Sequence, residues 1–259
     1  MEWRRVANYD EMSQMAAERI YAAVVAAGGR RFNLGLATGN TMLGLYRLLT
    51  EKLNHNRIDL RNLHTYNLDE YVGADGKAVP ENHPLSYRRH MRQNLFAVLD
   101  PALGFQEETQ AHFPDPVDPA GFDRGLAAAG GLGFQLLGIG FNGHIAFNEP
   151  ISASEISVAG YAALPSRVVV LEALTIQTNS RLTAGDDDAL VPRHAATMGM
   201  AQILAAREIL LLACFAEQLK PLRQMLHGEP TSELPASYLL THAQAVVVYT
   251  VDKIPLDHP

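Results

Sequence analysis

The chain has 259 residues, 47% of them hydrophobic, so it can bury one substantial core or divide into two domains. Its net charge of −7 excludes nucleic acid as the main partner, because phosphate backbones are bound by clustered Lys and Arg. The single cysteine, Cys214, excludes an intrachain disulfide and a multi-cysteine metal site. With no signal-peptide core and no run long enough to cross a membrane, we expect a cytoplasmic protein.

Short apolar runs alternate with segments of helical periodicity along the chain. The runs that we predict as strands are residues 32–37, 63–68, 134–140, 166–171, 208–214 and 245–251. Most are apolar throughout, which is typical of a parallel sheet covered by helices on both faces. The spacing of apolar residues predicts helices that begin after Asp10, Thr41 and Ser86, and another that ends at Gly228.

This alternation predicts one doubly wound α/β domain over residues 1–259, with a mostly parallel, Rossmann-like sheet. Residues 105–118 and 183–192 are expected to be loops, and the acidic run in the second loop is expected to be solvated. Ligands of such folds bind beyond the carboxyl ends of the strands. The polar residues that follow predicted strands are therefore the candidate site residues.

The stretch GIGFNGHIAFNEP fits the G-x-G-x-x-G template of dinucleotide-binding proteins through Gly138, Gly140 and Gly143. That template needs a long helix after its third glycine, whereas the proline that closes this stretch permits one turn at most. We interpret Gly140 and Gly143 as a flexible turn that lets the backbone approach a ligand while His144 projects from the end of the strand.

Polar side chains gather immediately after this turn. Asn142, His144, Asn148 and Glu149 lie within eight residues of one another. A lone histidine is more often structural, but an imidazole titrates near neutrality and a neighbouring carboxylate can orient it. The group therefore predicts a proton shuttle, of the kind that a sugar oxygen requires.

A second polar stretch follows the strand predicted at residues 32–37. Thr38, Gly39, Asn40 and Thr41 combine exposed backbone N–H groups, two hydroxyls and the start of a helix, which suits a phosphate or another anion. The alternative is that Thr41 merely caps the helix, and the sequence leaves both interpretations open.

A third polar stretch, Asp69 and Glu70, follows the strand predicted at residues 63–68. Paired acids at such a position often form a loop turn or a cap. An Asp aimed into a cleft can instead act as a general base that removes a proton next to a carbonyl or an imine.

Seven segments spread over nearly the whole chain resemble one family. They are LGLATGNT (34–41), NLDEYVG (67–73), ENHPLSY (81–87), LGIGFNGHIAFNEP (137–150), TNSR (178–181), PRHAATMGM (192–200) and LPASYLLTH (234–242). Together they resemble the glucosamine-6-phosphate deaminase (isomerase) family, with the 6-phosphogluconolactonases as a more distant relation. The pair NLDEYVG and GHIAFNEP is highly specific, because a lactonase-like sequence would usually carry a different stretch after its Gly-His.

The resemblance implies aldose–ketose isomerisation with deamination of a 2-amino-sugar phosphate, from glucosamine 6-phosphate to fructose 6-phosphate and ammonia. His144, oriented by Glu149 and positioned by Asn142, would open the sugar ring. Asp69 would move a proton from C2 to C1 through an enolamine. This chemistry needs no metal or organic cofactor, and the scattered histidines offer no obvious metal site.

The resemblance also implies how the distal end of the sugar is held. Arg181 corresponds to the family's phosphate-binding arginine and residues 38–41 to its phosphate loop, while residues 151–190 correspond to a mobile lid. A small-molecule amino sugar phosphate is then the partner. Because family members range from monomers to hexamers, a homo-oligomer is compatible with the resemblance.

The sequence departs from the family's pattern mainly at the phosphate end. Gln218 stands where the family's phosphate-binding lysine is expected, and Glu217 beside it would repel a phosphate if its side chain pointed inward. Asn40 replaces the second glycine of the phosphate loop, and residues 156–165 lengthen the lid. Asn142 stands where several members carry Asp, so it can position His144 without supplying charge.

Three alternative functions stay open at this stage. The substrate could be an unphosphorylated or differently substituted amino sugar, such as a galactosamine type, with its end group held by Asn40 and Gln218. The protein could be a sugar lactone hydrolase in which His144 activates water. It could also be a non-catalytic sugar-phosphate sensor, although the chain has no helix-turn-helix extension.

Overall fold

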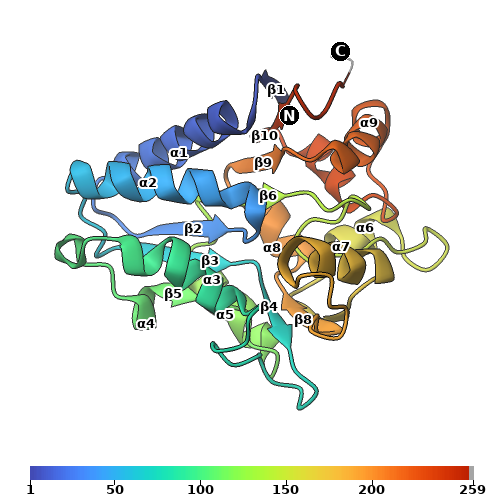
Figure 1. Cartoon of the computed structure of the whole chain (residues 1–259), viewed down its shortest axis with the longest axis horizontal. Coiled ribbons are helices and arrows are strands. Elements are labelled where there is room, and N and C mark those ends of the chain that lie inside the picture. The colour runs from blue at the N-terminus through green and yellow to red at the C-terminus, as the bar shows by residue number, and fades with distance from the viewer. Residues whose placement is uncertain (257–259) are drawn as a thin grey trace.

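Seven parallel strands form the central sheet of the computed structural model, which describes residues 1–256 (Figure 1). In spatial order they are β1 (Glu2–Val6), β10 (Ala245–Thr250), β9 (Ile209–Ala213), β6 (Phe134–Gly138), β2 (Phe32–Leu36), β3 (Leu63–Asn67) and β5 (Ala111–His112). Every neighbouring pair is parallel. The prediction of a mostly parallel sheet is confirmed, and the chain reverses its direction of travel across the sheet between β6 and β2.

The central strands are apolar because both of their faces are covered. All residues of β9 and β10 are buried, as expected for strands between two layers of helices. The edge strand β1 was not predicted, since four of its five residues are exposed or half-buried and its sequence EWRRV is mostly polar. The other edge strand, β5, is only two residues long, inside a stretch that was predicted as a loop.

A second sheet of three antiparallel strands lies beside the first. Its order is β4 (Asp69–Val72), β8 (His194–Thr197) and β7 (Arg167–Val170). The strand at β7 was predicted, but as one more apolar strand of a parallel sheet. β4 follows β3 after a single residue, so Asp69 opens a new strand instead of lying in the loop after one.

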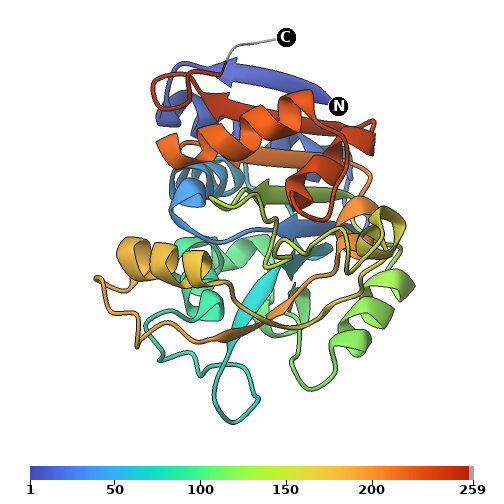
Figure 2. The ribbon, with the colours of Figure 1, turned by 90° about the vertical axis from the view of Figure 1, so that its right-hand side faces the viewer.

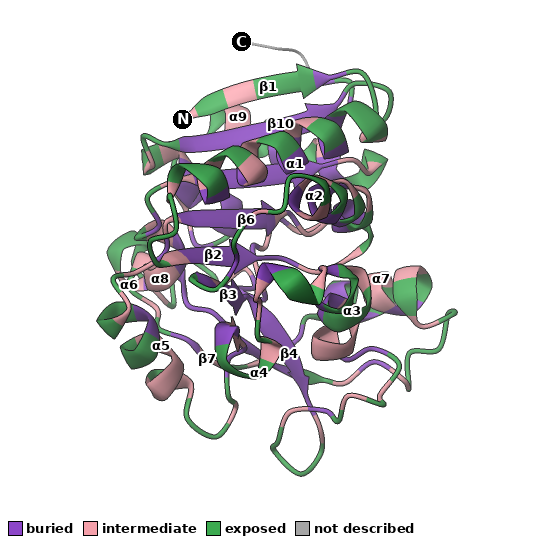
Figure 3. Ribbon diagram, turned by 90° about the vertical axis from the view of Figure 1, so that its left-hand side faces the viewer, coloured by how far each residue is buried: buried purple, intermediate pink, exposed green. Residues whose placement is uncertain are grey.

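Helices cover both faces of the central sheet (Figures 2 and 3). α1 (Tyr9–Ala26) and α2 (Leu43–His55) pack together on one face, and α9 (Leu219–His227) lies on the other. The remaining helices are α3 (Tyr87–Asn94), α4 (Glu107–Gln110), α5 (Pro119–Ala128), α6 (Val158–Ala162), α7 (Ala173–Thr183) and α8 (Met200–Leu204). None of the helices in the described part of the chain has the length and apolar character of a membrane span.

The predicted helix boundaries are partly correct. Ser86 caps α3 by accepting a hydrogen bond from the N–H of Arg89, and Gly228 follows the last residue of α9. The N-cap of α1 is Asn8, whose side chain accepts from the N–H of Glu11, so the cap predicted at Asp10 is wrong. Thr41 lies in a 3₁₀ turn, Asn40–Met42, and its side chain caps no helix.

Residues 156–165, which lengthen the predicted lid, are packed against the body of the protein. They contain α6, and Tyr161 of this helix is fully buried and stacks on Tyr238 with ring centroids 5.3 Å apart. The hydroxyl of Tyr161 donates a 2.7 Å hydrogen bond to the backbone carbonyl of Glu149. This segment therefore supports the stretch that carries the candidate site residues.

We predict that Gly44→Val lowers the free energy of unfolding by about 1–3 kcal/mol, because overpacking a tight contact forces its neighbours to move. A Cβ atom at Gly44 would lie 2.6 Å from Oγ of the buried Ser13, where α2 crosses α1. Gly125→Val is the matched control, since nothing lies within 4 Å of a Cβ atom there. Chemical denaturation measures both, and equal stabilities would contradict the close contact.

Candidate active site

A cavity of about 470 Å³ lies where the strands of the central sheet end. Segments that follow β2, β3, β6 and β9 line it, together with residues of α3 and α7. It opens at the point between β2 and β6 where the chain reverses direction, which is where α/β folds of this kind bind ligands. Asp69 and His144 both line this one cavity, so the two candidate proton-transfer residues share a cleft.

The glycine-rich stretch after β6 makes room for His144. A Cβ atom at Gly140 would lie 2.4 Å from the imidazole ring of His144, so only glycine fits there. Gly143 adopts the left-handed conformation with a φ of 88°, and no helix follows it before α6. The structure therefore confirms that the template match is not a dinucleotide fingerprint.

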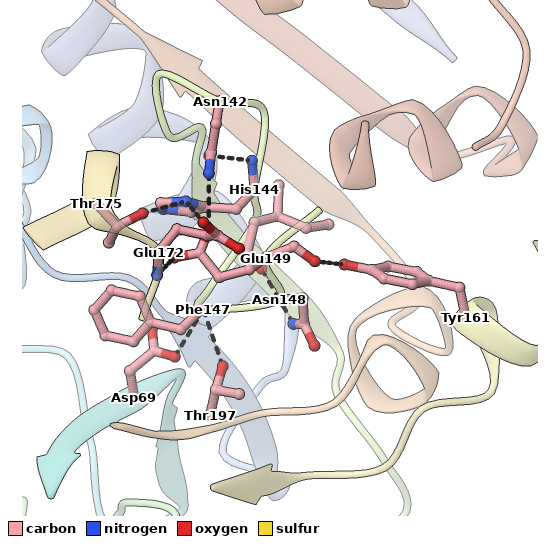
Figure 4. Close-up of polar contacts among 11 residues, drawn as sticks. Asp69, Asn142, His144, Phe147, Asn148, Glu149, Tyr161, Glu172, Thr175 and Thr197 are labelled. Atoms are coloured by element: carbon pink, nitrogen blue, oxygen red, sulfur yellow. Dashed lines mark hydrogen bonds and ion pairs between the residues drawn. The ribbon is translucent and has the colours of Figure 1, made fainter. Parts of the chain in front are cut away.

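His144, Glu149 and Asn142 form one hydrogen-bonded group (Figure 4). Nδ1 of His144 lies 3.2 Å from Oε2 of Glu149, and Nδ2 of Asn142 donates to the same oxygen at 2.8 Å. Because a carboxylate only accepts, Nδ1 carries the hydrogen and Nε2 is left to exchange a proton with a ligand. The structure brings these three predicted residues together, and Asn142 acts through its amide.

The carboxyl group of Glu149 is held in its ionised form. Burial acts to raise its pKa, but the charge of His144 and the hydrogen bonds from His144, Thr175 and Asn142 outweigh burial and lower the pKa to about 2. The backbone N–H of Glu172 adds a 3.3 Å hydrogen bond to the other oxygen. Glu149 is thus a permanent negative charge beside the imidazole.

Asp69 is held in the opposite electrostatic state. Its side chain is only 7% exposed, and burial raises its pKa to about 7, against the effect of hydrogen bonds from Thr197 and from the backbone of Phe147. The N–H of Phe147 lies 3.1 Å from Oδ1 of Asp69 (Figure 4). A carboxylate that titrates near neutrality in a cavity can both take and return a proton.

Glu70, the second acid of the pair, points away from the cavity and anchors α3. Its carboxylate accepts hydrogen bonds from the backbone N–H groups of Tyr71, Tyr87 and Arg88 and from the hydroxyl of Ser86. The two acids therefore have separate roles, since Glu70 ties β4 to the start of α3 while Asp69 faces the cavity.

The predicted anion loop, residues 38–41, lines the same cavity. Gly39 has a φ of 101°, which only glycine adopts without strain. Nδ2 of Asn40 lies 3.4 Å from the backbone carbonyl of Leu182, so the side chain that replaces the expected glycine links this loop to α7.

Gln218 lines the cavity, but its side-chain amide is hydrogen-bonded to backbone groups of the protein. Nε2 donates to the carbonyl of Ile139 at 2.7 Å, and Oε1 accepts from the backbone N–H groups of Cys214 and Phe215. The side chain is 2% exposed. Gln218 therefore joins the ends of β6 and β9 and supplies no cation in place of the expected lysine.

The predicted phosphate-binding arginine, Arg181, is not among the residues that line the cavity. It is exposed on α7 and forms a 2.8 Å ion pair with Glu217. Glu217 does not point inward as the repulsion argument assumed, because its side chain is 44% exposed and is paired with Arg181.

Several site residues were missed for different reasons. Thr175 of α7 lies 3.4 Å from Nδ1 of His144, and its segment was predicted only as part of a lid. Thr197 pairs with Asp69 in the small sheet and belongs to β8, which was not predicted. Tyr87 and His90 line the cavity from α3, which was predicted as a helix without a role in the site. The segments ENHPLSY and PRHAATMGM contained Tyr87 and Thr197, so their position in those segments was the only signal. Among residues 1–256, no three His, Cys, Asp or Glu side chains gather as a metal site would require.

Comparisons with known proteins place this geometry in a family. A family model described as glucosamine-6-phosphate isomerases/6-phosphogluconolactonase matches residues 7–148. A glucosamine-6-phosphate deaminase of Geobacillus sp. (strain WCH70) is 38% identical over 99% of this chain and 96% of its own length. A second, from Rhodopirellula baltica, is 41% identical over 83% of this chain and 80% of its own length.

Solved structures agree with this match. A protein described as a monomeric glucosamine-6-phosphate deaminase superposes with a TM-score of 0.86 and 29% identity, covering 99% of this chain and 100% of the other. A 6-phosphogluconolactonase from Plasmodium vivax superposes with a TM-score of 0.71 at 17% identity, covering 96% of this chain and 90% of the other, which shows a shared fold.

We predict that Asp69→Asn stabilises the protein at neutral and higher pH. The folded state holds a proton on Asp69 up to a pH of about 7, whereas the unfolded chain releases it near pH 4. The wild type therefore loses stability relative to the variant as pH rises through this window, by up to about 4 kcal/mol. Denaturation at pH 4 and pH 8 measures the difference, and the exposed Asp188→Asn is the control. If the difference in stability between Asp69→Asn and the wild type were the same at pH 4 and pH 8, it would contradict a raised pKa of Asp69.

Proposed function

This chain belongs to the glucosamine-6-phosphate isomerase and 6-phosphogluconolactonase family, and we propose that it isomerises and deaminates glucosamine 6-phosphate to fructose 6-phosphate and ammonia. The observation that carries the proposal is that Asp69 and the His144–Glu149 pair line one cavity. The named relatives, at 38% and 41% identity, support this substrate. The proposal includes a cytoplasmic location and a small-molecule amino sugar phosphate as the partner.

The first step is opening of the sugar ring. Nε2 of His144 takes the proton of the hydroxyl on C1 and delivers it to the ring oxygen, which leaves an open-chain aldehyde. The imidazolium that forms in passing is stabilised by the ionised carboxylate of Glu149, 3.2 Å from Nδ1. Asn142 and Thr175 keep the ring and the carboxylate in this orientation.

The second step moves a proton between two carbons. The carboxylate of Asp69 removes the proton from C2 while the aldehyde oxygen on C1 takes up a proton, which gives an enolamine. Asp69 then returns its proton to C1 and the amino nitrogen gives one up, so that a hydroxyl stands on C1 and an imine at C2. Water then adds to C2 and ammonia leaves, so one water is consumed for each ammonia released. A base with a pKa of about 7 suits both halves of this transfer at neutral pH.

The distal phosphate is assigned to the loop of residues 38–41, with Arg181 as its cationic partner. The loop lines the cavity, and Arg181 lies beside it with its guanidinium 5.8 Å from the ring centroid of the lining residue Phe141. We propose α7 as the part of the predicted lid that closes over the bound sugar, because closure excludes water from the enolamine.

We predict that Asp69→Asn lowers ammonia release from glucosamine 6-phosphate by about 10²–10⁴-fold, the usual contribution of a general base. Asp10→Asn makes the same chemical change at an exposed position of α1 and should leave the rate unchanged. A coupled assay for ammonia measures both. A variant with the wild-type rate would exclude Asp69 as the base. A wild type that hydrolyses 6-phosphogluconolactone without releasing ammonia would support the lactonase alternative.

The raised pKa of Asp69 also predicts the pH dependence of the reaction. Because the base must be deprotonated, kcat/KM should rise with pH, by about tenfold per unit, and level off above the pKa of about 7. Initial rates from pH 5 to 8 at low substrate concentration measure this profile. A profile that is already flat at pH 5 would mean that no group with this pKa has to lose its proton.

A further inference from the structure

The cavity is short of positive charge for a substrate that carries a phosphate. Within the described part of the chain, the residues that line it include no Lys or Arg. Among residues 1–256, His90 and His144 are the only basic side chains that line it, and burial lowers the pKa of His90. The amide of Gln218 occupies the place of the expected lysine and is fully engaged with backbone groups. A phosphate in the cavity therefore depends on Arg181 for a fixed positive charge.

Arg181 already has an anionic partner. Its Nη2 lies 2.8 Å from Oε1 of Glu217, a residue of the 3₁₀ turn Ala216–Gln218 that follows β9. A guanidinium binds a carboxylate and a phosphate through the same N–H groups, so the two anions compete for it. Both side chains of the ion pair are about half exposed, and such pairs contribute little to stability and exchange partners readily.

The surroundings of Glu217 allow such an exchange. Lys220 and Arg223 line a surface hollow together with Glu217, outside the cavity, so other cations are near once Arg181 turns away. The guanidinium of Arg181 lies over the ring of Phe141, which itself lines the cavity.

We propose that Glu217 is a specificity-determining residue that competes with the phosphate of the substrate for Arg181. This inference rests on the proposed function, because it concerns the distal end of the same substrate. Each binding event exchanges the carboxylate of Glu217 for the phosphate. The phosphate then adds less to affinity than it would with an unpaired arginine, and phosphorylated and free amino sugars are discriminated less sharply.

The test is Glu217→Gln, which keeps the shape of the side chain and removes its charge. KM for glucosamine 6-phosphate should fall about three- to tenfold, as expected when a weak exposed ion pair no longer competes for Arg181. The change should appear in KM and not in kcat, because the phosphate is bound equally in the ground state and the transition state. KM for unphosphorylated glucosamine should show no such fall.

Two further variants identify the cause. In an Arg181→Gln background, Glu217→Gln should change KM by less than about twofold, since the contested guanidinium is gone. Glu108→Gln removes one negative charge from the exposed surface of α4 and should leave KM unchanged. A rise in KM for glucosamine 6-phosphate in Glu217→Gln would overturn the proposal, because it would mean that Glu217 orients Arg181 toward the phosphate.

Calorimetric binding of glucosamine 6-phosphate separates this inference from the proposed function. A wild type that binds the sugar phosphate but releases no ammonia would refute the proposed reaction. The affinity ratio of Glu217→Gln to wild type would still report on the competition. An unchanged affinity in a variant with wild-type thermal stability would refute the role of Glu217 while leaving the deaminase activity in place.

Discussion

The candidate site depends on one three-centred hydrogen bond. The backbone N–H of Phe147 faces both Oδ1 of Asp69 and Oγ1 of Thr197, at 3.1 Å and 3.0 Å. This hydrogen bond joins the turn after β6, which carries His144 and Glu149, to β4 of the small sheet. Without this contact the imidazole and the carboxylate would belong to separate parts of the fold. With it, His144 and Asp69, to which we assign proton transfer between oxygens and between carbons, share one cavity.

The sequence predicted five of the seven strands of the central sheet and the glycine turn after β6, because both depend on local patterns. Apolar runs mark β2, β3, β6, β9 and β10, and glycine spacing followed by proline marks the turn after β6. The small sheet could not be predicted in this way. β4 and β8 are four residues each, and their polar ends, such as Asp69 and Thr197, make sense only when the strands pair. Likewise, nothing in the sequence showed that Glu217 would pair with Arg181 and that Gln218 would bond to the backbone, since both depend on how α7 and the end of β9 meet.

The two ends of the cavity differ in how firmly their charges are held. At the end of the cavity that holds Glu149 and Asp69, both residues are about 7% exposed. Burial raises the pKa of Asp69, and the contacts of Glu149 with His144, Thr175 and Asn142 lower that of Glu149. At the distal end, the side chains of Arg181 and Glu217 are about half exposed and form an ion pair with each other. Fixed charges favour one reaction, whereas an exposed pair can exchange partners at low energetic cost. In the proposed mechanism, the reaction therefore depends on buried, fixed charges, whereas discrimination between substrates depends on an exposed ion pair that can exchange partners.

The segment between residues 151 and 190 also contains one firmly held part, α6, and one part with weaker contacts, α7. α6 is bound through Tyr161, which is fully buried and whose hydroxyl holds the carbonyl of Glu149, so moving α6 would expose apolar surface and disturb the site. α7 has Ile176 as its only buried apolar residue and is otherwise held by polar contacts, from Thr175, Asn179, Arg181 and Leu182. Polar contacts can be replaced by water or by ligand, whereas buried apolar area cannot. The closing movement that we propose is therefore assigned to α7, and the longer stretch before it holds Glu149 in place through Tyr161.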